Sequence, residues 1–501
     1  FLIDTLPDDN DHVLIKVQPF TRDPFNRVEK MNVYTGRRTP VARIPVPHAD
    51  YHTDNDGQVR LADGVGAGNF SQLHYRADDS AEWKLVNDER QSGRVEIPLG
   101  FSAGNAIAYL RVSHEAGPSS IVAWEPATGK RTEVVRDALL DPSPLYRTGC
   151  NGCGVPVGAY FLTNTPKLAF FDEASSDARL HRSLEKAFPG HRVWITSSSN
   201  DGRYKVLQVE SDRDPGNFFL FDTQAKTAEL ILHRSKGIDP ATMSSMRTIA
   251  LKARDGTPLH GYLTVPSGST GKNLPMVVMP HGGPFGVFDD WAYNPDTQLL
   301  AQAGYAVLQV NFRGSGNQGR AFRQAGARQW GGTMQDDVTD ATRWAIEQGV
   351  ADAERICIYG ASYGAYTALM GVAKEPGLYR CAAGYVGVYD LPTMRREDRF
   401  GSRATQTWMS EWVGDDEAKL AANSPNRLAS RIKAPVFLAA GGDDLVAPIE
   451  HSRMMERALK SANVPVETLY YPGEGHGFYK PEHRREFYTR LLAFLGRHLG
   501  D

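Results

Sequence analysis

The segment Arg355-Ile-Cys-Ile-Tyr-Gly-Ala-Ser-Tyr-Gly-Ala-Tyr-Thr-Ala-Leu369 decides the fold of the C-terminal half of this chain. An apolar, strand-like run leads into Gly-x-Ser-x-Gly at residues 360–364, and a helical pattern follows. This order is typical of a sharp strand-to-helix turn that exposes a nucleophilic serine at the start of a helix. We therefore predict that Ser362 is a nucleophile at the carboxyl edge of a parallel sheet.

Strand-like and helical patterns alternate on both sides of this serine, from about residue 244 to the end of the chain. This alternation predicts a doubly wound, mostly parallel α/β domain, which we place at residues 241–501. The expected strands are Met276–Met279, Ala306–Val310, Ile356–Tyr359, Ala383–Val386, Val436–Ala439 and Glu467–Tyr470, and the expected helices are Asp296–Ala303, Gln335–Glu347, Tyr363–Ala373, Ile449–Lys460 and His483–His498.

A serine nucleophile needs a base within hydrogen-bond reach, and the base needs a carboxylate that orients it. Two segments downstream of Ser362 follow expected strands and supply these groups: one contains Asp443 and Asp444, the other contains His476 between two glycines. Both lie at the same sheet edge as the serine. We predict Asp444 as the acid and His476 as the base, with Asp443 as the alternative acid.

Backbone N–H groups near the serine are also required, because they stabilise the negative charge that develops on the substrate oxygen. Met279-Pro-His-Gly-Gly-Pro284 follows an expected strand and contains two consecutive glycines. We predict that the N–H of Gly283 (alternatively Gly282) and the N–H of Tyr363 form this oxyanion hole. A tight turn without catalytic meaning is the alternative interpretation.

The first half of the chain consists of short strand-like runs separated by turn signals. An aromatic residue followed by a turn recurs at Tyr34–Arg37, Trp124–Lys130 and Phe221–Lys226, at intervals of 93 and 96 residues. Half of each interval is about 47 residues, with weaker copies near Glu82–Lys84 and Asp177–Arg179. This period is typical of four-stranded propeller blades. We predict a β-propeller domain of about five blades over residues 1–240, with a β-sandwich as the alternative.

Composition excludes several classes of protein. The 501 residues carry a net charge of −3, which favours neither nucleic acid nor an anionic membrane as a partner. The longest apolar runs are far shorter than a membrane-spanning helix. We therefore expect a soluble protein without nucleic-acid or membrane partners, and we leave its compartment undecided.

Four cysteines are too few for a disulfide scaffold in a chain of this length. Cys150 and Cys153 form a single Cys-x-x-Cys, for which a zinc site, a local disulfide and two free thiols all remain open. Because a structural zinc normally needs four ligands and no second pair is present, we predict no metal and no cofactor. Cys357 and Cys381 lie in apolar stretches and are interpreted as buried thiols.

Four motifs together resemble the prolyl oligopeptidase family of serine peptidases, particularly its acylaminoacyl-peptidase-like branch. They are His281–Pro284, Asn311-Phe-Arg-Gly-Ser-Gly316, Gly360–Gly364 and Glu474-Gly-His-Gly-Phe478. The resemblance covers roughly residues 244–501 and implies an α/β-hydrolase domain with the triad Ser362, Asp444 and His476. It also implies hydrolysis of short peptides through an acyl-enzyme, beneath a propeller that covers the site.

Two features bear on that resemblance. The acid loop reads Asp444-Leu-Val-Ala-Pro448, where the family usually has Asp-x-Arg-Val-Pro, and this departure keeps Asp443 open as the acid. The family usually builds seven blades, and the chain begins with Phe1 inside a strand-like run. We therefore expect that about two blades precede Phe1, and that the open propeller self-associates or pairs with the missing segment. A closed five-bladed ring is the alternative.

Two other functions are compatible with these motifs. A carboxylesterase shares the triad and the fold, but it would not need a propeller of about 240 residues. An inactive scaffold that binds partners through its propeller would not need an intact set of catalytic residues. Asp88 and Glu89 are one candidate among many for binding a free peptide amino terminus.

Overall fold

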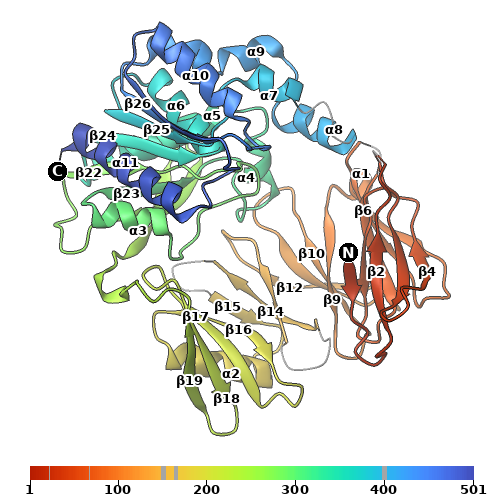
Figure 1. Ribbon diagram of the computed structural model, residues 1–501. Coiled ribbons are helices and arrows are strands. Elements are labelled where there is room, and N and C mark those ends of the chain that lie inside the picture. Colours follow the sequence, from red (N-terminus) through yellow and green to blue (C-terminus); the bar gives the residue numbers. More distant parts are fainter. Residues whose placement is uncertain (22, 67, 148–153, 163–166, 398–402, 501) are drawn as a thin grey trace.

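The computed structural model describes the whole chain except residues 22, 67, 148–153, 163–166, 398–402 and 501. Five small antiparallel sheets form an arc, and an eight-stranded sheet with helices on both faces follows them (Figure 1). The fold is therefore a β-propeller domain followed by an α/β-hydrolase domain, as the sequence predicts. The Cys-x-x-Cys at residues 150–153 lies outside the described residues.

Four of the five small sheets have four strands in sequence order, and one has three. The blades consist of β1 (Leu2–Asp4), β2 (His12–Val17), β3 (Arg27–Asn32) and β4 (Arg38–Arg43); β5 (Asp50–Thr53), β6 (Val59–Val65), β7 (Ser71–Tyr75) and β8 (Lys84–Asp88), with α1 (Glu89–Ser92) after it; β9 (Glu96–Phe101), β10 (Ala108–Val112), β11 (Ser120–Trp124) and β12 (Arg131–Arg136); β13 (Ser143–Tyr146), β14 (Pro156–Phe161) and β15 (Lys167–Phe170), with α2 (Ser176–Ala187) after it; and β16 (Arg192–Ser198), β17 (Tyr204–Glu210), β18 (Asn217–Asp222) and β19 (Thr227–His233).

The repeat found in the sequence has a structural cause. The three strong turn signals connect the third and fourth strands of the first, third and fifth blades, so they recur every second blade. The weaker signal at Glu82–Lys84 lies at the same place in the second blade. The signal at Asp177–Arg179 does not, because these residues belong to helix α2, which follows the third strand of the fourth blade.

The first and fifth blades are not joined. Among the described residues, no strand of the β1–β4 sheet pairs with a strand of the β16–β19 sheet. Strand β19 is solvent-exposed along its whole length. The five blades therefore form an open arc (Figure 1). The expectations of preceding blades and of self-association stay predictions.

The second domain is built on one sheet in the order β20-β21-β23-β22-β24-β25-β26-β27. The strands from β22 to β27 run parallel, whereas β20 and β21 form an antiparallel extension that the sequence analysis missed. The strands are β20 (Met246–Lys252), β21 (Pro258–Thr264), β22 (Leu274–Val278), β23 (Ala306–Asn311), β24 (Ala351–Ala361), β25 (Cys381–Tyr385), β26 (Val436–Gly441) and β27 (Val466–Tyr471).

Helices cover both faces of this sheet, and each face has its own hydrophobic core. Helices α5, α6 and α10 contribute to the larger core, while α3 and α11 contribute to the smaller one on the other face. The helical elements of this half are η1 (Pro240–Thr242), α3 (Pro295–Gln302), α4 (Arg320–Ala325), α5 (Thr333–Glu347), α6 (Tyr363–Lys374), α7 (Leu391–Glu397), α8 (Arg403–Trp412), α9 (Glu417–Ala422), η3 (Pro425–Arg431), α10 (Ile449–Ser461) and α11 (Pro481–Leu499).

The interpretation of Cys357 and Cys381 as buried thiols is wrong, because a disulfide joins them. The two residues are direct partners in the register of the parallel strands β24 and β25, with Cα atoms 4.7 Å apart. Both side chains are fully buried, as expected, in the smaller core. A sequence separation of 24 residues gives no sign that the two strands are neighbours in this register.

Polar contacts hold the two domains together. Arg192 of the fifth blade forms an ion pair with Asp290 at 2.7 Å, and the Asp212 carboxylate accepts the N–H of Met246 at 2.7 Å. On the other side of the arc, Asp141 accepts the N–H of Gly319 at 3.0 Å. Contacts from separate blades therefore set the position of the arc relative to the hydrolase domain.

Two kinds of feature are absent from the described part of the chain. None of its helices is long and apolar enough to cross a membrane. Within the same residues, no group of three or more His, Cys, Asp or Glu side chains is arranged to hold a metal ion.

Candidate active site

Ser362 stands between the last residue of β24 and the first residue of α6. Its backbone has φ 57° and ψ −119°, a conformation that is strained for a residue with a side chain. The flanking glycines allow this turn: a Cβ at Gly360 would lie 2.5 Å from the backbone of Gly364, and one at Gly364 would lie 2.2 Å from the carbonyl oxygen of Pro280. The strand-to-helix turn predicted from Gly-x-Ser-x-Gly is present.

His476 and Asp444 are in direct contact. The Nδ1–H of His476 donates a hydrogen bond to Oδ2 of Asp444 at 2.8 Å, and the carboxylate is fully buried. The other oxygen of Asp444 accepts the N–H groups of Val446 and Ala447 at 2.8 and 2.9 Å. Asp443 is exposed instead, so the structure pairs the histidine with Asp444. This arrangement leaves Nε2 as the basic nitrogen of His476.

Tyr385, the last residue of β25, connects the serine turn to the histidine loop. Its carbonyl oxygen accepts the N–H of Ser362 at 2.9 Å, and its hydroxyl accepts the N–H of Phe478. Strand β25 lies between β24, which precedes the serine, and β26, which precedes the acid. One residue therefore holds two loops at the same carboxyl edge. The sequence analysis missed Tyr385, because its residue type signals only an apolar strand end.

Glu474 fixes the histidine loop from within. Its carboxylate accepts the N–H groups of Tyr479 and Lys480 at 2.8 and 3.1 Å and contacts Nδ1 of His483 at 2.6 Å. These hydrogen bonds outweigh the effect of burial and lower the pKa of Glu474. The loop around His476 is thus tied to the start of α11. The motif Glu474–Phe478 contained this residue, but its role was not predicted.

The loop at residues 281–284 packs against the serine turn. A Cβ at Gly282 would lie 3.5 Å from the Cβ of Ser362, so the glycine permits a close approach. Neither the N–H of Gly283 nor that of Tyr363 donates a hydrogen bond to an acceptor within the described part of the chain. Free donors next to a serine nucleophile are what an oxyanion hole requires.

Both ring nitrogens of His281 are engaged within this part of the fold. Its Nδ1–H donates to the carbonyl oxygen of Gly282 at 2.7 Å, its Nε2 contacts the Ser315 hydroxyl at 2.8 Å, and its ring stacks on Phe312 with centroids 4.3 Å apart. Burial lowers the pKa of His281 to about 4, so the ring is neutral at pH 7. Because a carbonyl only accepts, Nδ1 carries the proton and Nε2 accepts the hydroxyl.

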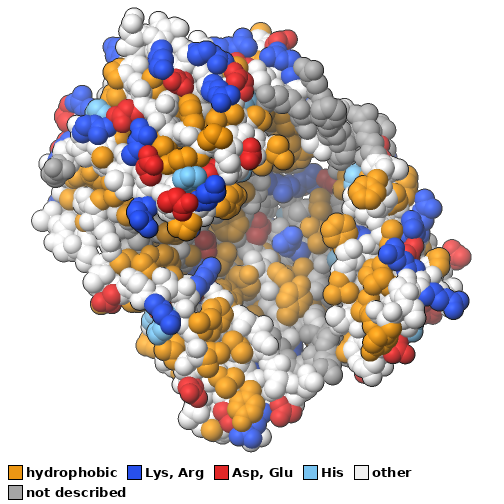
Figure 2. Space-filling model, viewed as in Figure 1, with side chains coloured by type: hydrophobic (Ala, Val, Ile, Leu, Met, Phe, Trp, Pro, Cys, Tyr) orange, Lys and Arg blue, Asp and Glu red, His pale blue; other side chains and the backbone are white. Residues whose placement is uncertain are grey.

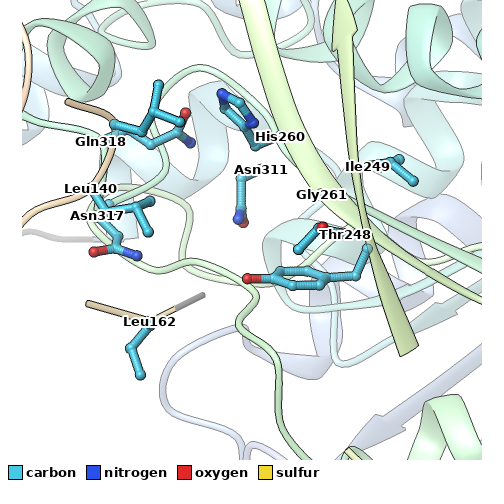
Figure 3. Close-up of a pocket in the computed structure, with 12 residues that line it drawn as sticks. Leu140, Leu162, Thr248, Ile249, His260, Gly261, Asn311, Asn317 and Gln318 are labelled. Carbon is cyan, nitrogen blue, oxygen red and sulfur yellow. The ribbon is translucent and has the colours of Figure 1, made fainter. Parts of the chain in front are cut away.

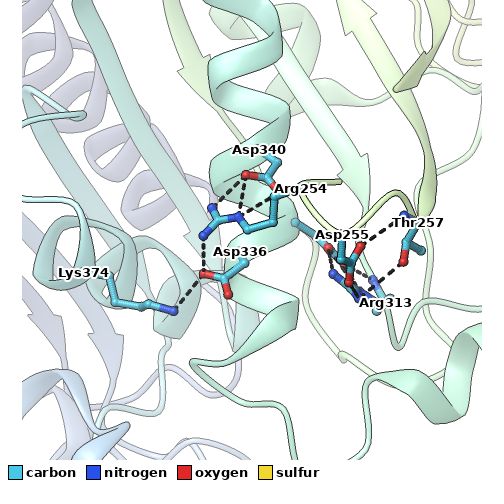
Figure 4. Close-up of polar contacts among 8 residues, drawn as sticks. Arg254, Asp255, Thr257, Arg313, Asp336, Asp340 and Lys374 are labelled. Carbon is cyan, nitrogen blue, oxygen red and sulfur yellow. Dashed lines mark hydrogen bonds and ion pairs between the residues drawn. The ribbon is translucent and has the colours of Figure 1, made fainter. Parts of the chain in front are cut away.

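Arg313, from the motif at residues 311–316, anchors the loop that carries Phe312 and Ser315. Its guanidinium binds the fully buried carboxylate of Asp337 with contacts of 2.5 to 3.1 Å and also binds Asp255 at the edge of the domain. Figure 4 shows Arg313 next to Asp255 and Thr257. The hydrogen bonds that Arg313 donates to Asp337 raise the pKa of its guanidinium, so the anchor stays charged.

A mostly apolar cavity of about 310 Å³ lies between the fourth blade and the antiparallel edge of the second sheet. Figure 3 shows Leu140 and Gln318 on one side of it, opposite Thr248 and Ile249. Burial lowers the pKa of His260, which also lines it. None of the predicted catalytic residues contributes to this cavity.

Asp88 and Glu89 are already bound within the protein. Asp88 accepts hydrogen bonds from Arg90 and Gln72, whereas Glu89 accepts the N–H of Ser71 at 2.8 Å and forms an ion pair with Arg320 of the second domain. A role in binding a peptide amino terminus would require these contacts to be broken.

Comparisons with known proteins agree with this architecture. The profile of the prolyl oligopeptidase family matches residues 291–501. The match includes the serine turn, the acid loop and the histidine loop. The resemblance drawn from the four motifs is confirmed, and the chain is a serine-type peptidase by class.

The relatives differ in how much of the chain they match. Dipeptidyl aminopeptidase BIII of Pseudoxanthomonas mexicana is 28% identical over 494 residues, which is 95% of this chain and 70% of the relative. The human acylamino-acid-releasing enzyme is 29% identical over 245 residues, only 46% of this chain and 32% of that enzyme. A crystal structure of puromycin hydrolase matches the fold with a TM-score of 0.74 at 19% identity, over 99% of this chain and 78% of that one.

Proposed function

We propose that this prolyl oligopeptidase-family chain hydrolyses short peptides through an acyl-enzyme, with Ser362 as nucleophile, His476 as base and Asp444 as the orienting acid. The contact between His476 and Asp444 supports this proposal most strongly. It fixes the Nδ1–H tautomer and directs a basic Nε2 away from the carboxylate.

The reaction follows from these groups. Nε2 of His476 takes the hydroxyl proton of Ser362 while Oγ bonds to the carbonyl carbon of the scissile peptide bond. The N–H groups of Gly283 and Tyr363 stabilise the resulting oxyanion. The C–N bond then breaks, and His476 gives its proton to the leaving amine. Water, activated by His476, hydrolyses the acyl-enzyme and regenerates the serine hydroxyl.

The propeller favours peptides over simple esters as substrates. Figure 2 shows a hollow between the blades and the hydrolase domain, and we place the approach of the substrate in this partly enclosed space. The relative that matches nearly the whole chain is named a dipeptidyl aminopeptidase. We therefore expect release of dipeptides from short peptides, in preference to removal of an N-acylated residue.

A three-way assay tests this function. The wild-type chain should react covalently with a fluorophosphonate probe and cleave dipeptidyl p-nitroanilides faster than N-acyl-aminoacyl p-nitroanilides. Ser362→Ala should remove the labelling and lower kcat by about 10⁴-fold or more. Cleavage of p-nitrophenyl esters alone would identify a carboxylesterase, and absence of labelling would identify an inactive scaffold.

A further inference from the structure

A cavity of about 260 Å³ lies where the ends of the third and fourth blades meet the hydrolase domain. On the hydrolase side it is lined by Gly286 and Phe288, which follow the predicted oxyanion loop, and by residues between 316 and 323. Ser362 and His476 do not line it. The cavity is therefore separate from the side chains proposed to hydrolyse the peptide bond.

Three arginines line this cavity: Arg111 from β10, and Arg320 and Arg323 from α4. Arg320 is bound to Glu89 and to the carbonyl oxygen of Gly93. Within the described part of the chain, Arg111 and Arg323 form no ion pair with a carboxylate. Two guanidinium groups are thus available to an anion that enters the cavity.

The positive charges are close enough to affect one another. Burial lowers the pKa of Arg323 and repulsion from Arg320 and Arg111 lowers it further, while the charges of Asp141 and Glu89 partly oppose these effects. The guanidinium of Arg323 lies over the ring of Trp412, 5.3 Å from its centroid. These neighbours hold the guanidinium in place without neutralising it.

Asp141 also lines the cavity, and its carboxylate is hydrogen-bonded to main-chain groups of the same cavity wall. Its two oxygens accept the N–H groups of Ser119 at 2.7 Å and Gly319 at 3.0 Å. Within the described residues no ion pair joins either oxygen to an arginine, although the negative charge of Asp141 acts on Arg323. With Arg320 paired to Glu89, the charges of Arg111 and Arg323 outweigh the single negative charge of Asp141, so the cavity keeps a net positive charge. An anion in it would gain charge-assisted hydrogen bonds.

The cavity is within reach of a peptide bound at the serine. Gly282 packs against Ser362, and Gly286 at the cavity wall is four residues further along the chain. Four residues span at most about 14 Å. The cavity wall at Gly286 therefore lies within about 14 Å of Gly282, a distance that about four residues of an extended peptide also span.

We propose that Arg111 and Arg323 bind the C-terminal carboxylate of the peptide substrate, and that this contact selects short peptides with a free C-terminus. The planar forks of two arginines match the geometry of a carboxylate. The proposal rests on the peptidase function proposed above. It adds that the free carboxylate lies within about four residues of the scissile bond.

Matched peptides test this assignment. One short peptide is prepared as the free acid, as the C-terminal amide, and as an amide whose last residue is glutamate. Wild-type kcat/KM should be about 10-fold to 100-fold higher for the free acid than for the amide. Arg111→Gln and Arg323→Gln should each lower that ratio by slowing cleavage of the free acid. Arg37→Gln, at an exposed turn of the first blade, is the control.

Binding of the same peptides to Ser362→Ala by calorimetry gives a second readout that needs no turnover. Tighter binding of the acid than of the amide, lost in Ser362→Ala/Arg111→Gln, supports the carboxylate site. This holds even if the wild-type chain cleaves neither peptide. Absence of cleavage would refute the proposed peptidase function but not the carboxylate site. Equal affinity for acid and amide, or a ratio that neither arginine variant changes, overturns the site. Recognition of the glutamate amide as strongly as of the acid overturns the assignment to the C-terminal carboxylate.

Discussion

The Nδ1–H of His281 donates a hydrogen bond to the carbonyl oxygen of Gly282 at 2.7 Å. This carbonyl and the N–H of Gly283 belong to the same planar peptide unit, and they point in opposite directions. Fixing the carbonyl therefore fixes the direction of the N–H that we propose as an oxyanion donor. His281 is thus a positioning residue, and its own neutral ring never needs to exchange a proton with substrate.

His281→Ala should lower kcat by about 10-fold to 100-fold, less than the loss expected for a missing oxyanion donor, and leave KM nearly unchanged. Steady-state kinetics on a p-nitroanilide measures both constants. Ser315→Ala removes only the partner of Nε2 and should have a smaller effect. An increase in KM with normal kcat for His281→Ala would place the residue in substrate binding instead.

Asp444→Asn should lower kcat by about 10⁴-fold, because the amide cannot stabilise the protonated His476 and favours the wrong tautomer. Asp443→Asn, next to it in the chain and exposed, should retain near-normal activity. The pair is measured with one substrate at one pH. If Asp443→Asn is the more damaging change, the acid is assigned to the wrong aspartate.

Folding stability should fall as the pH drops from about 6.5 towards 4. Burial lowers the pKa of His281 and of His181 to about 4, below the ordinary value of 6.5. In this range the unfolded chain binds protons that the folded chain excludes, so acid favours unfolding, by up to about 1.4 kcal/mol per pH unit for each histidine. Urea unfolding at pH 7.5 and pH 5 measures the difference. His281→Asn should reduce the pH dependence, and an unchanged dependence would contradict the assignment of a neutral buried ring.

Replacing Cys357 and Cys381 together by alanine should lower the free energy of unfolding by about 3 kcal/mol, the value expected for closing a loop of 24 residues. The serine turn follows β24 directly, but its geometry depends on glycines and on Tyr385. Fluorophosphonate labelling of the folded variant should therefore remain. Guanidinium unfolding with and without reductant measures the loss, and equal stability would show that the bond contributes nothing.

The sequence alone determined the elements whose signal is local. The turn at Ser362 needs small residues at fixed spacing, and strands such as β10 and β17 show alternating buried residues along the sequence. The expected helices Ile449–Lys460 and His483–His498 agree closely with α10 and α11 for the same reason. Burial of one face of a helix or strand requires apolar residues at regular spacing, and this spacing can be recognised in a short stretch of sequence.

Only the tertiary structure decided which distant residues meet. Whether His476 contacts Asp443 or Asp444 depends on how two loops from different strands are packed, and the pairing of Cys357 with Cys381 depends on the register of β24 and β25. The neutral state of His281 and the convergence of Arg111 with Arg323 likewise arise from elements far apart in the chain. Burial, charge coupling and strand register are set by the assembled fold, so no local pattern could predict them.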